Sequence, residues 1–166
     1  MLGSILSKFN EYKDIAKASM AMQQLVQDPV HQWQDVKPIF HSEAEQAVVK
    51  IAYSDEFRLV FAYVRALIQN NELSQRALAL TTEAVRHNPA HYTLWEYRRN
   101  ILQSLKSDLR EELKFSAECI EGSHKNYQLW HHRRVLIDLL KDPSEEQAFT
   151  ESILKIDEKN YHAWQH

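Results

Sequence analysis

Two short runs of the chain carry the residues Lys-Asn-Tyr, at 125–127 and 159–161, each directly before an apolar segment with helical spacing. The first turn of a helix has free backbone N–H groups and the positive end of the helix dipole, so it stabilises an anion. The lysine, the tyrosine and, after the second run, His162 would add charge and donors there. A single lysine at a helix start is usually an ordinary solvated residue, but one repeated with tyrosine and histidine on one edge could form a diphosphate-binding rim.

The neighbouring His131 and His132 raise the question of a metal site, but adjacent helical residues point about 100° apart. The sequence has neither an HExxH motif nor a cysteine cluster to supply further ligands. Cys119 falls within a predicted helix without a paired base, and no G-x-S-x-G motif occurs. We therefore expect no metal ligand and no nucleophile in this chain, and a buried structural cysteine.

The composition indicates a soluble, all-α protein. The 166 residues include only two glycines and four prolines, so tight hairpins are scarce and helices joined by short links are favoured. A net charge of −3 gives no general field for nucleic acid. No apolar run approaches the roughly 18 residues that suggest a membrane span. The single cysteine suits a reducing compartment, for which the cytoplasm is the simplest expectation.

Apolar residues spaced three and four apart predict a series of helices that would position these residues. Ser54 is placed as the N-cap of the first helix, and Asp108 with Glu111 forms a capping-box pattern further on. The spacing predicts helices over 55–70 and 74–87, helices that begin near 92 and 108, a helix over 126–140, one capped by 142–143, and one from 160.

The aromatic residues reveal a repeat. Tyr92, Tyr127 and Tyr161 are 35 and 34 residues apart, and three tryptophans follow the same intervals. A period of this length with two helices per unit is typical of an α-solenoid of helical hairpins, similar to tetratricopeptide repeats. The repeated tryptophans are expected to be core wedges between the hairpins: Trp95, Trp130 and Trp164. The helix after 143 is expected to bury Phe149, Ile153 and Ile156.

The arginine pairs 98–99 and 133–134 come three and four residues after two of these tryptophans. One member of each pair can lie along the core and reach carboxylates between helices. The repeat also divides the chain into an N-terminal extension of unknown order (1–32), an extended lead-in containing Pro38 (33–54), and the repeat domain (55–166). Because the last helix is shorter than its siblings, we expect the repeat domain to be incomplete at its C-terminus.

The stretches "NPAHYTLWEYRRNILQSL", "HKNYQLWHHRRVLIDLLKDPSEE" and "EKNYHAWQH" resemble consecutive repeats of the protein prenyltransferase alpha subunit. The upstream "VVKIAYSDEFRLVFAYVRALI" and "WQDVKPI" resemble the lead-in of the alpha subunit shared by protein farnesyltransferase and type I geranylgeranyltransferase. The resemblance implies a right-handed α-α superhelix wrapped around a beta subunit that holds the catalytic zinc, and it leaves magnesium open. The implied reaction transfers a farnesyl or geranylgeranyl group from its diphosphate to the cysteine of a C-terminal CaaX motif.

Carried over by position, the resemblance makes Lys125 the candidate catalytic residue, which would reach the diphosphate. It makes Gln128 a residue that would recognise the peptide's terminal carboxylate through a hydrogen bond from its amide. The remaining candidate substrate-binding residues are Tyr92, Tyr127, Asn160, Tyr161 and His162. Two positions depart from the family pattern, His91 and Glu96, where the family more often has Asn and His.

Two alternatives remain open at this point. A tetratricopeptide-like adaptor would bind peptides without doing chemistry, although the two glycines and four prolines supply few of the positions that such repeats use. The chain could also be a truncated, non-catalytic isoform. If the chain is the alpha subunit that the resemblance implies, it is expected to be active as a heterodimer with a beta subunit and inactive alone.

Overall fold

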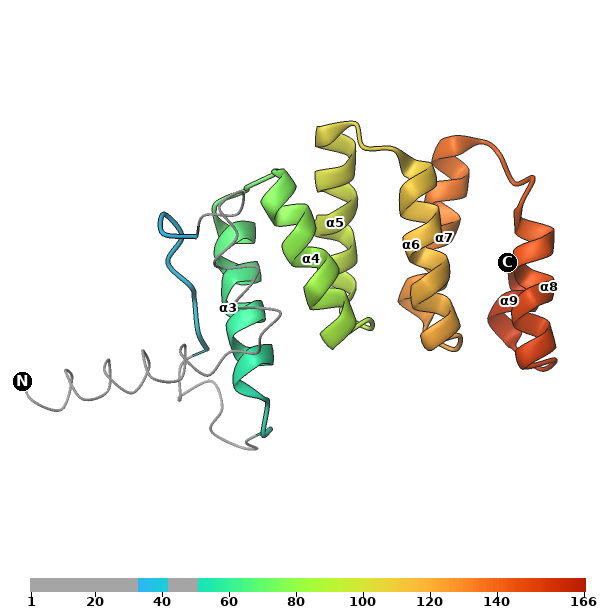
Figure 1. Cartoon of the computed structure of the whole chain (residues 1–166), viewed down its shortest axis with the longest axis horizontal. Coiled ribbons are helices and arrows are strands. Elements are labelled where there is room, and N and C mark those ends of the chain that lie inside the picture. Colours follow the sequence, from blue (N-terminus) through green and yellow to red (C-terminus); the bar gives the residue numbers. More distant parts are fainter. Residues whose placement is uncertain (1–32, 42–50) are drawn as a thin grey trace, which may run out of the picture. The chain divides into compact units, whose positions relative to one another are not determined.

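The computed structural model describes residues 33–41 and 51–166, and its described part is helical without strands (Figure 1). The chain divides into two compact units, 1–84 and 85–166. None of the described helices combines the length and hydrophobicity that a membrane crossing needs. The helices are α3 (Asp55–Gln69), α4 (Gln75–His87), α5 (Tyr92–Leu105), α6 (Leu109–Gly122), α7 (Tyr127–Leu140), α8 (Glu146–Ile156) and α9 (Tyr161–Gln165). This confirms the all-α prediction.

In the first unit, residues 33–41 form no helix and are fastened to α3 and α4. The Trp33 ring is buried beside Tyr63, with ring centroids 5.2 Å apart. The amide of Ile39 donates to the Ala62 carbonyl at 3.0 Å. The predicted extension 1–32 and the segment 42–50 lie outside the described residues, so their predicted organisation stays a prediction.

Helix starts follow the predicted caps with two corrections. Ser54 Oγ accepts the Phe57 amide at 3.2 Å, as expected of an N-cap. Asp108 caps α6 through the Arg110 amide at 2.9 Å, but Glu111 is paired with Lys114 Nζ at 2.7 Å, so the predicted capping box is only half formed.

The helix after 143 also differs from the prediction. Helix α8 begins at Glu146, because Asp142 is engaged in a turn in which its Oδ1 accepts the Ser144 amide at 3.2 Å. Ile153 is fully buried, but Ile156 is 62% exposed, so its predicted place in the core is wrong. The reason is that Ile156 is the last residue of α8, so it lies at the exposed end of the helix rather than within its packed length.

The three repeat tryptophans share one hydrogen bond but differ in burial. Each indole Nε1 donates at 2.8 Å to the carbonyl six residues earlier, which pins the helix to the loop before it. Trp95 is 0% exposed and Trp130 5%, whereas Trp164 is 70% exposed, so the core prediction is wrong for the third. The reason lies in the neighbours, because later helices cover the first two rings and no later described helix covers Trp164.

The arginine prediction is confirmed in both repeats. Arg98 makes a bidentate pair with Glu112 at 2.6 and 2.7 Å, and Arg133 makes one with Glu146 at 2.8 and 2.6 Å. A histidine from the next helix pair bonds to each carboxylate, His132 at 2.8 Å and His166 at 2.6 Å. We call these sets the Glu112 cluster (Arg98, Glu112, His132) and the Glu146 cluster (Arg133, Glu146, His166).

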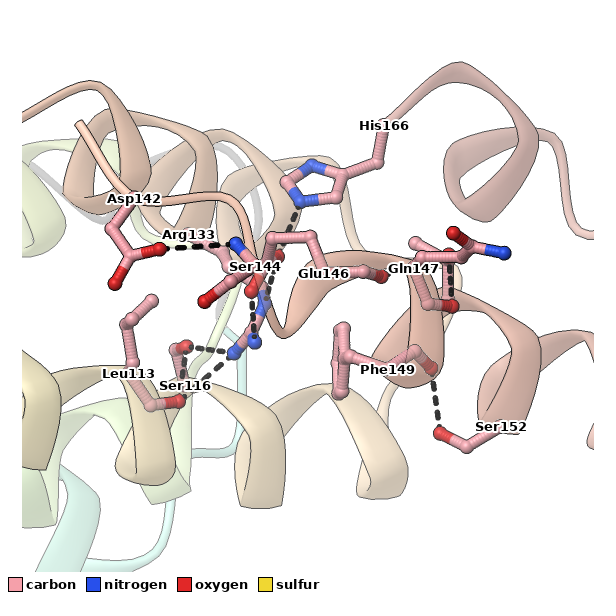
Figure 2. Close-up of polar contacts among 11 residues, drawn as sticks. Leu113, Ser116, Arg133, Asp142, Ser144, Glu146, Gln147, Phe149, Ser152 and His166 are labelled. Atoms are coloured by element: carbon pink, nitrogen blue, oxygen red, sulfur yellow. Dashed lines mark hydrogen bonds and ion pairs between the residues drawn. The ribbon is translucent and has the colours of Figure 1, made fainter. Parts of the chain in front are cut away.

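The two clusters link three successive helices each. Figure 2 shows Arg133 between Glu146 and the Leu113 carbonyl, with His166 on the same carboxylate. The guanidinium of Arg133 also lies 3.7 Å from the Phe149 ring centroid, in a cation–π contact. The clusters therefore join the arginine helix, the second helix of its own hairpin and the first helix of the next.

Burial sets the protonation of the Glu112 cluster. Loss of hydration lowers the pKa of His132 below its ordinary 6.5, because the hydrogen bond with Glu112 does not offset it. Burial raises the pKa of Glu112, but hydrogen bonds from His132 and Arg98 outweigh that effect and leave the pKa below 4.5. The cluster therefore holds a neutral imidazole whose Nε2–H donates to an ionised carboxylate.

We expect acidification to destabilise the chain through His132. Below about pH 6.5 the unfolded chain binds a proton that folded His132 does not, so stability falls by up to about 1.4 kcal/mol per pH unit. The unfolding temperature of His132→Gln is expected to fall less between about pH 7 and about pH 5.5 than that of the wild type. His131→Gln, at the exposed neighbouring position, should keep the wild-type slope; equal slopes in all three proteins would contradict the assignment.

Candidate functional site

The starts of α5, α7 and α9 are built alike. Asn126 caps α7 by accepting the Gln128 amide at 2.9 Å, and Asn160 caps α9 by accepting the His162 amide at 3.0 Å. At α5 the departure from the family pattern is accommodated, since His91 Nδ1 accepts the Leu94 amide at 3.2 Å. The residue after each cap is an exposed tyrosine, with exposed fractions of 69, 69 and 61% for Tyr92, Tyr127 and Tyr161.

Asn160 also ties the last two helix starts together. Its Nδ2 donates to the His124 carbonyl at 2.8 Å, and the same carbonyl accepts the Trp130 indole at 2.8 Å. The Asn160 side chain is fully buried. The Asn160 side chain therefore links the loop before α7 to the start of α9. This link places Lys125 and Tyr161 at the same edge.

Lys125 has a charge partner at this edge. Its Nζ lies 2.9 Å from Oδ2 of Asp157, and its side chain is 71% exposed. Asp157 Oδ1 accepts the Lys159 amide at 3.2 Å. The ammonium beside it lowers the pKa of Asp157 below 3.8. Sequence reasoning missed Asp157, because the corresponding place one repeat earlier is Ser123 and the repeat therefore gave no signal.

A small hollow of about 170 Å³ opens beside Tyr127 and His162, whose rings meet edge to face with centroids 4.2 Å apart. We call Lys125, Tyr127, Tyr161 and His162 the rim residues. Gln128 is half-buried in the first turn of α7, and Tyr92 lies one repeat earlier. The hollow is lined by Tyr127, Trp130, His131, Arg134, His162, Gln165 and His166.

His131 and Arg134 are not among the candidate site residues predicted from the sequence, yet both line this hollow. Their i, i+3 spacing on α7 could have indicated a shared face. Cys119 is half-buried, and burial raises the pKa of its thiol to about 11, so the thiol stays protonated near neutral pH. The edge itself carries hydrogen-bond donors and the ammonium of Lys125.

The fold and this edge define a class: a helical-repeat scaffold with lysine, tyrosine and histidine side chains at its helix starts. Three segments, 74–105, 109–140 and 143–166, match the family model described as the protein prenyltransferase alpha subunit repeat. The chain belongs to this family. The match begins at the first residues before α4 and continues through the rim residues to the C-terminus.

Curated proteins with similar sequences have a more specific name within this family. The protein farnesyltransferase/geranylgeranyltransferase type-1 subunit alpha of Solanum lycopersicum is 48% identical over 83 residues, which are 50% of this chain and 24% of the relative. The protein of the same name from Schizosaccharomyces pombe is 42% identical over 95 residues, 57% of this chain and 32% of the relative. The matched part is thus about a quarter to a third of these relatives.

A solved structure supports the fold. A chain of the Candida albicans protein geranylgeranyltransferase-I complexed with GGPP matches with a TM-score of 0.75 and 31% identity. The match covers 83% of this chain and 48% of that chain. Both the fold class and the resemblance expected from the sequence are confirmed.

Proposed function

We propose that this chain works as the alpha subunit, or part of it, of a heterodimeric CaaX protein prenyltransferase. The observation that carries the proposal is the edge that gathers Lys125, Tyr127 and His162 in a chain similar to farnesyltransferase/geranylgeranyltransferase type-1 alpha subunits. The adaptor alternative has no observation in its favour. The cytoplasm is the proposed location, as the single cysteine suits a reducing compartment.

In the proposed reaction the cysteine sulfur of the CaaX peptide forms a bond to C1 of the isoprenoid. The C1–O bond breaks, the diphosphate leaves with the electron pair, and the thiol proton is lost. Lys125 would neutralise the charge that grows on the leaving diphosphate, which stabilises the transition state more than the bound substrate. Its exposed, flexible side chain suits this part, because it can follow the diphosphate as it leaves.

The other candidate residues would serve binding. Tyr127, Tyr161 and His162 would line the diphosphate side, and Tyr92 would lie near the peptide. Gln128 would donate to the peptide's terminal carboxylate through its amide. Asn160 would act by holding the rim residues in place, since its buried side chain is occupied by the His162 amide and the His124 carbonyl.

The isoprenoid pocket and the zinc would belong to the beta subunit, so the proposal covers farnesyl and geranylgeranyl diphosphate alike. We assign no metal ligand to this chain. Of the two histidines that first suggested one, His132 is engaged by Glu112, and His131 lines the hollow.

We expect Lys125→Ala, co-expressed with a farnesyltransferase beta subunit, to slow prenyl transfer to a CaaX peptide by roughly a hundredfold. The loss should fall on kcat more than on KM, because the contact strengthens as charge develops. Lys114→Ala is the matched control: it removes another exposed, ion-paired lysine, from α6, and should keep wild-type rates. Equal rates for Lys125→Ala and the wild-type complex would overturn the part assigned to Lys125.

A further inference from the structure

Asp157 is held firmly at the end of α8. Its backbone is extended, with φ −143° and ψ 95°, and its amide donates to the Ile153 carbonyl at 3.0 Å. Its own carbonyl accepts the Asn160 amide at 3.0 Å, and its Oδ1 accepts the Lys159 amide at 3.2 Å. The carboxylate therefore has little freedom to follow a partner that moves.

The other carboxylate oxygen of Asp157 depends on Lys125. Oδ2 is itself shielded from solvent, although the Asp157 side chain as a whole is 20% exposed. The Lys125 ammonium is 2.9 Å from Oδ2, and His124 Nε2 is 3.8 Å away. A fixed, shielded carboxylate thus faces an ammonium on a flexible and mostly exposed stem.

This ion pair is not part of the repeat architecture. Ser123 ends α6 as Asp157 ends α8, and its side chain carries no charge. The Glu112 and Glu146 clusters, by contrast, recur in both repeats and hold the stack together. Of these two helix ends, only the end of α8 carries this ion pair, and it lies beside the rim residues. Ligand binding therefore explains the pair better than packing of the repeats does.

We propose that Asp157 is the resting counter-ion of Lys125, a positioning residue that holds the ammonium at the rim and competes with a diphosphate for it. The inference rests on the proposed function. To meet the bound diphosphate, Lys125 must leave a shielded carboxylate, which weakens ground-state binding. The leaving diphosphate carries more negative charge than the bound substrate, so it attracts Lys125 away from Asp157 more strongly. The Lys125 contact therefore stabilises the transition state more than the ground state. The same competition favours release of the diphosphate product.

Titration of the 166-residue chain with inorganic pyrophosphate tests this competition, with the dissociation constant measured by calorimetry in every variant and the Lys125 side chain followed by NMR where it is present. Asp157→Asn is expected to bind pyrophosphate about two- to fivefold more tightly, the equivalent of one exposed ion pair. A merely structural residue would weaken binding when replaced. Glu158→Gln removes the same charge from the neighbouring exposed position and should leave the dissociation constant unchanged. In a Lys125→Ala background, Asp157→Asn should have no effect.

The outcomes separate the two proposals. Unchanged or weaker binding in Asp157→Asn, with Lys125 responding to pyrophosphate, would overturn the counter-ion role and leave the proposed function standing. An equal gain in Glu158→Gln, or a gain that persists without Lys125, would show a general charge effect and also overturn it. No response of Lys125 in any variant would count against its contact with diphosphate, and the inference would fall with it.

Discussion

Replacement of Glu112 by alanine is expected to destabilise the chain by about 3–5 kcal/mol, because it leaves a buried guanidinium without its counter-ion. Arg98 and Glu112 are each 4% exposed, and His132 donates to the same carboxylate. Guanidinium chloride unfolding followed by circular dichroism measures the loss.

Two companion variants serve as controls for this prediction. Arg98→Met combined with Glu112→Leu removes both charges and should recover much of the lost stability, since apolar substitutes for a buried pair are often neutral. Glu111→Ala, at the preceding position, breaks an exposed pair with Lys114 and should cost little. A loss from Glu112→Ala no larger than that of Glu111→Ala would mean that the cluster contributes nothing to stability.

Trp95→Ala is expected to cost about 3–5 kcal/mol, the usual range for removal of a large buried aromatic ring. The Trp95 ring is 0% exposed and lies 4.5 Å from the His132 ring and 6.4 Å from the Phe115 ring. Its removal would also leave the Pro89 carbonyl without its indole donor. The same unfolding experiment reports the loss.

Trp164→Ala provides a control at the same repeat position. Its indole makes the same hydrogen bond six residues back, at 2.8 Å, but its ring is 70% exposed. We expect its loss to be a small fraction of that of Trp95→Ala. Similar losses at the two positions would show that the shared hydrogen bond, and not burial by the following helices, supplies the stabilisation.

Local features of the sequence determined the helices and the repeat. Helix boundaries agree within about a residue at α3, α4 and α7, where capping residues and apolar spacing act within a few positions of each other. The two Lys-Asn-Tyr runs were also predicted to mark helix starts, and they lie at the starts of α7 and α9. The inward path of Arg98 and Arg133 followed from their spacing after the tryptophans.

Only the tertiary structure decided which partners meet across the repeats. Glu112 and His132 are 20 residues apart, and Lys125 and Asp157 are 32 apart, so no local pattern connects them. Trp95 and Trp164 share a repeat position and a hydrogen bond, yet one is buried and the other exposed. The reason is that a solenoid repeat buries its apolar face only against its neighbours, so burial and charge pairing depend on the adjoining helices rather than on the residue's own surroundings in the sequence.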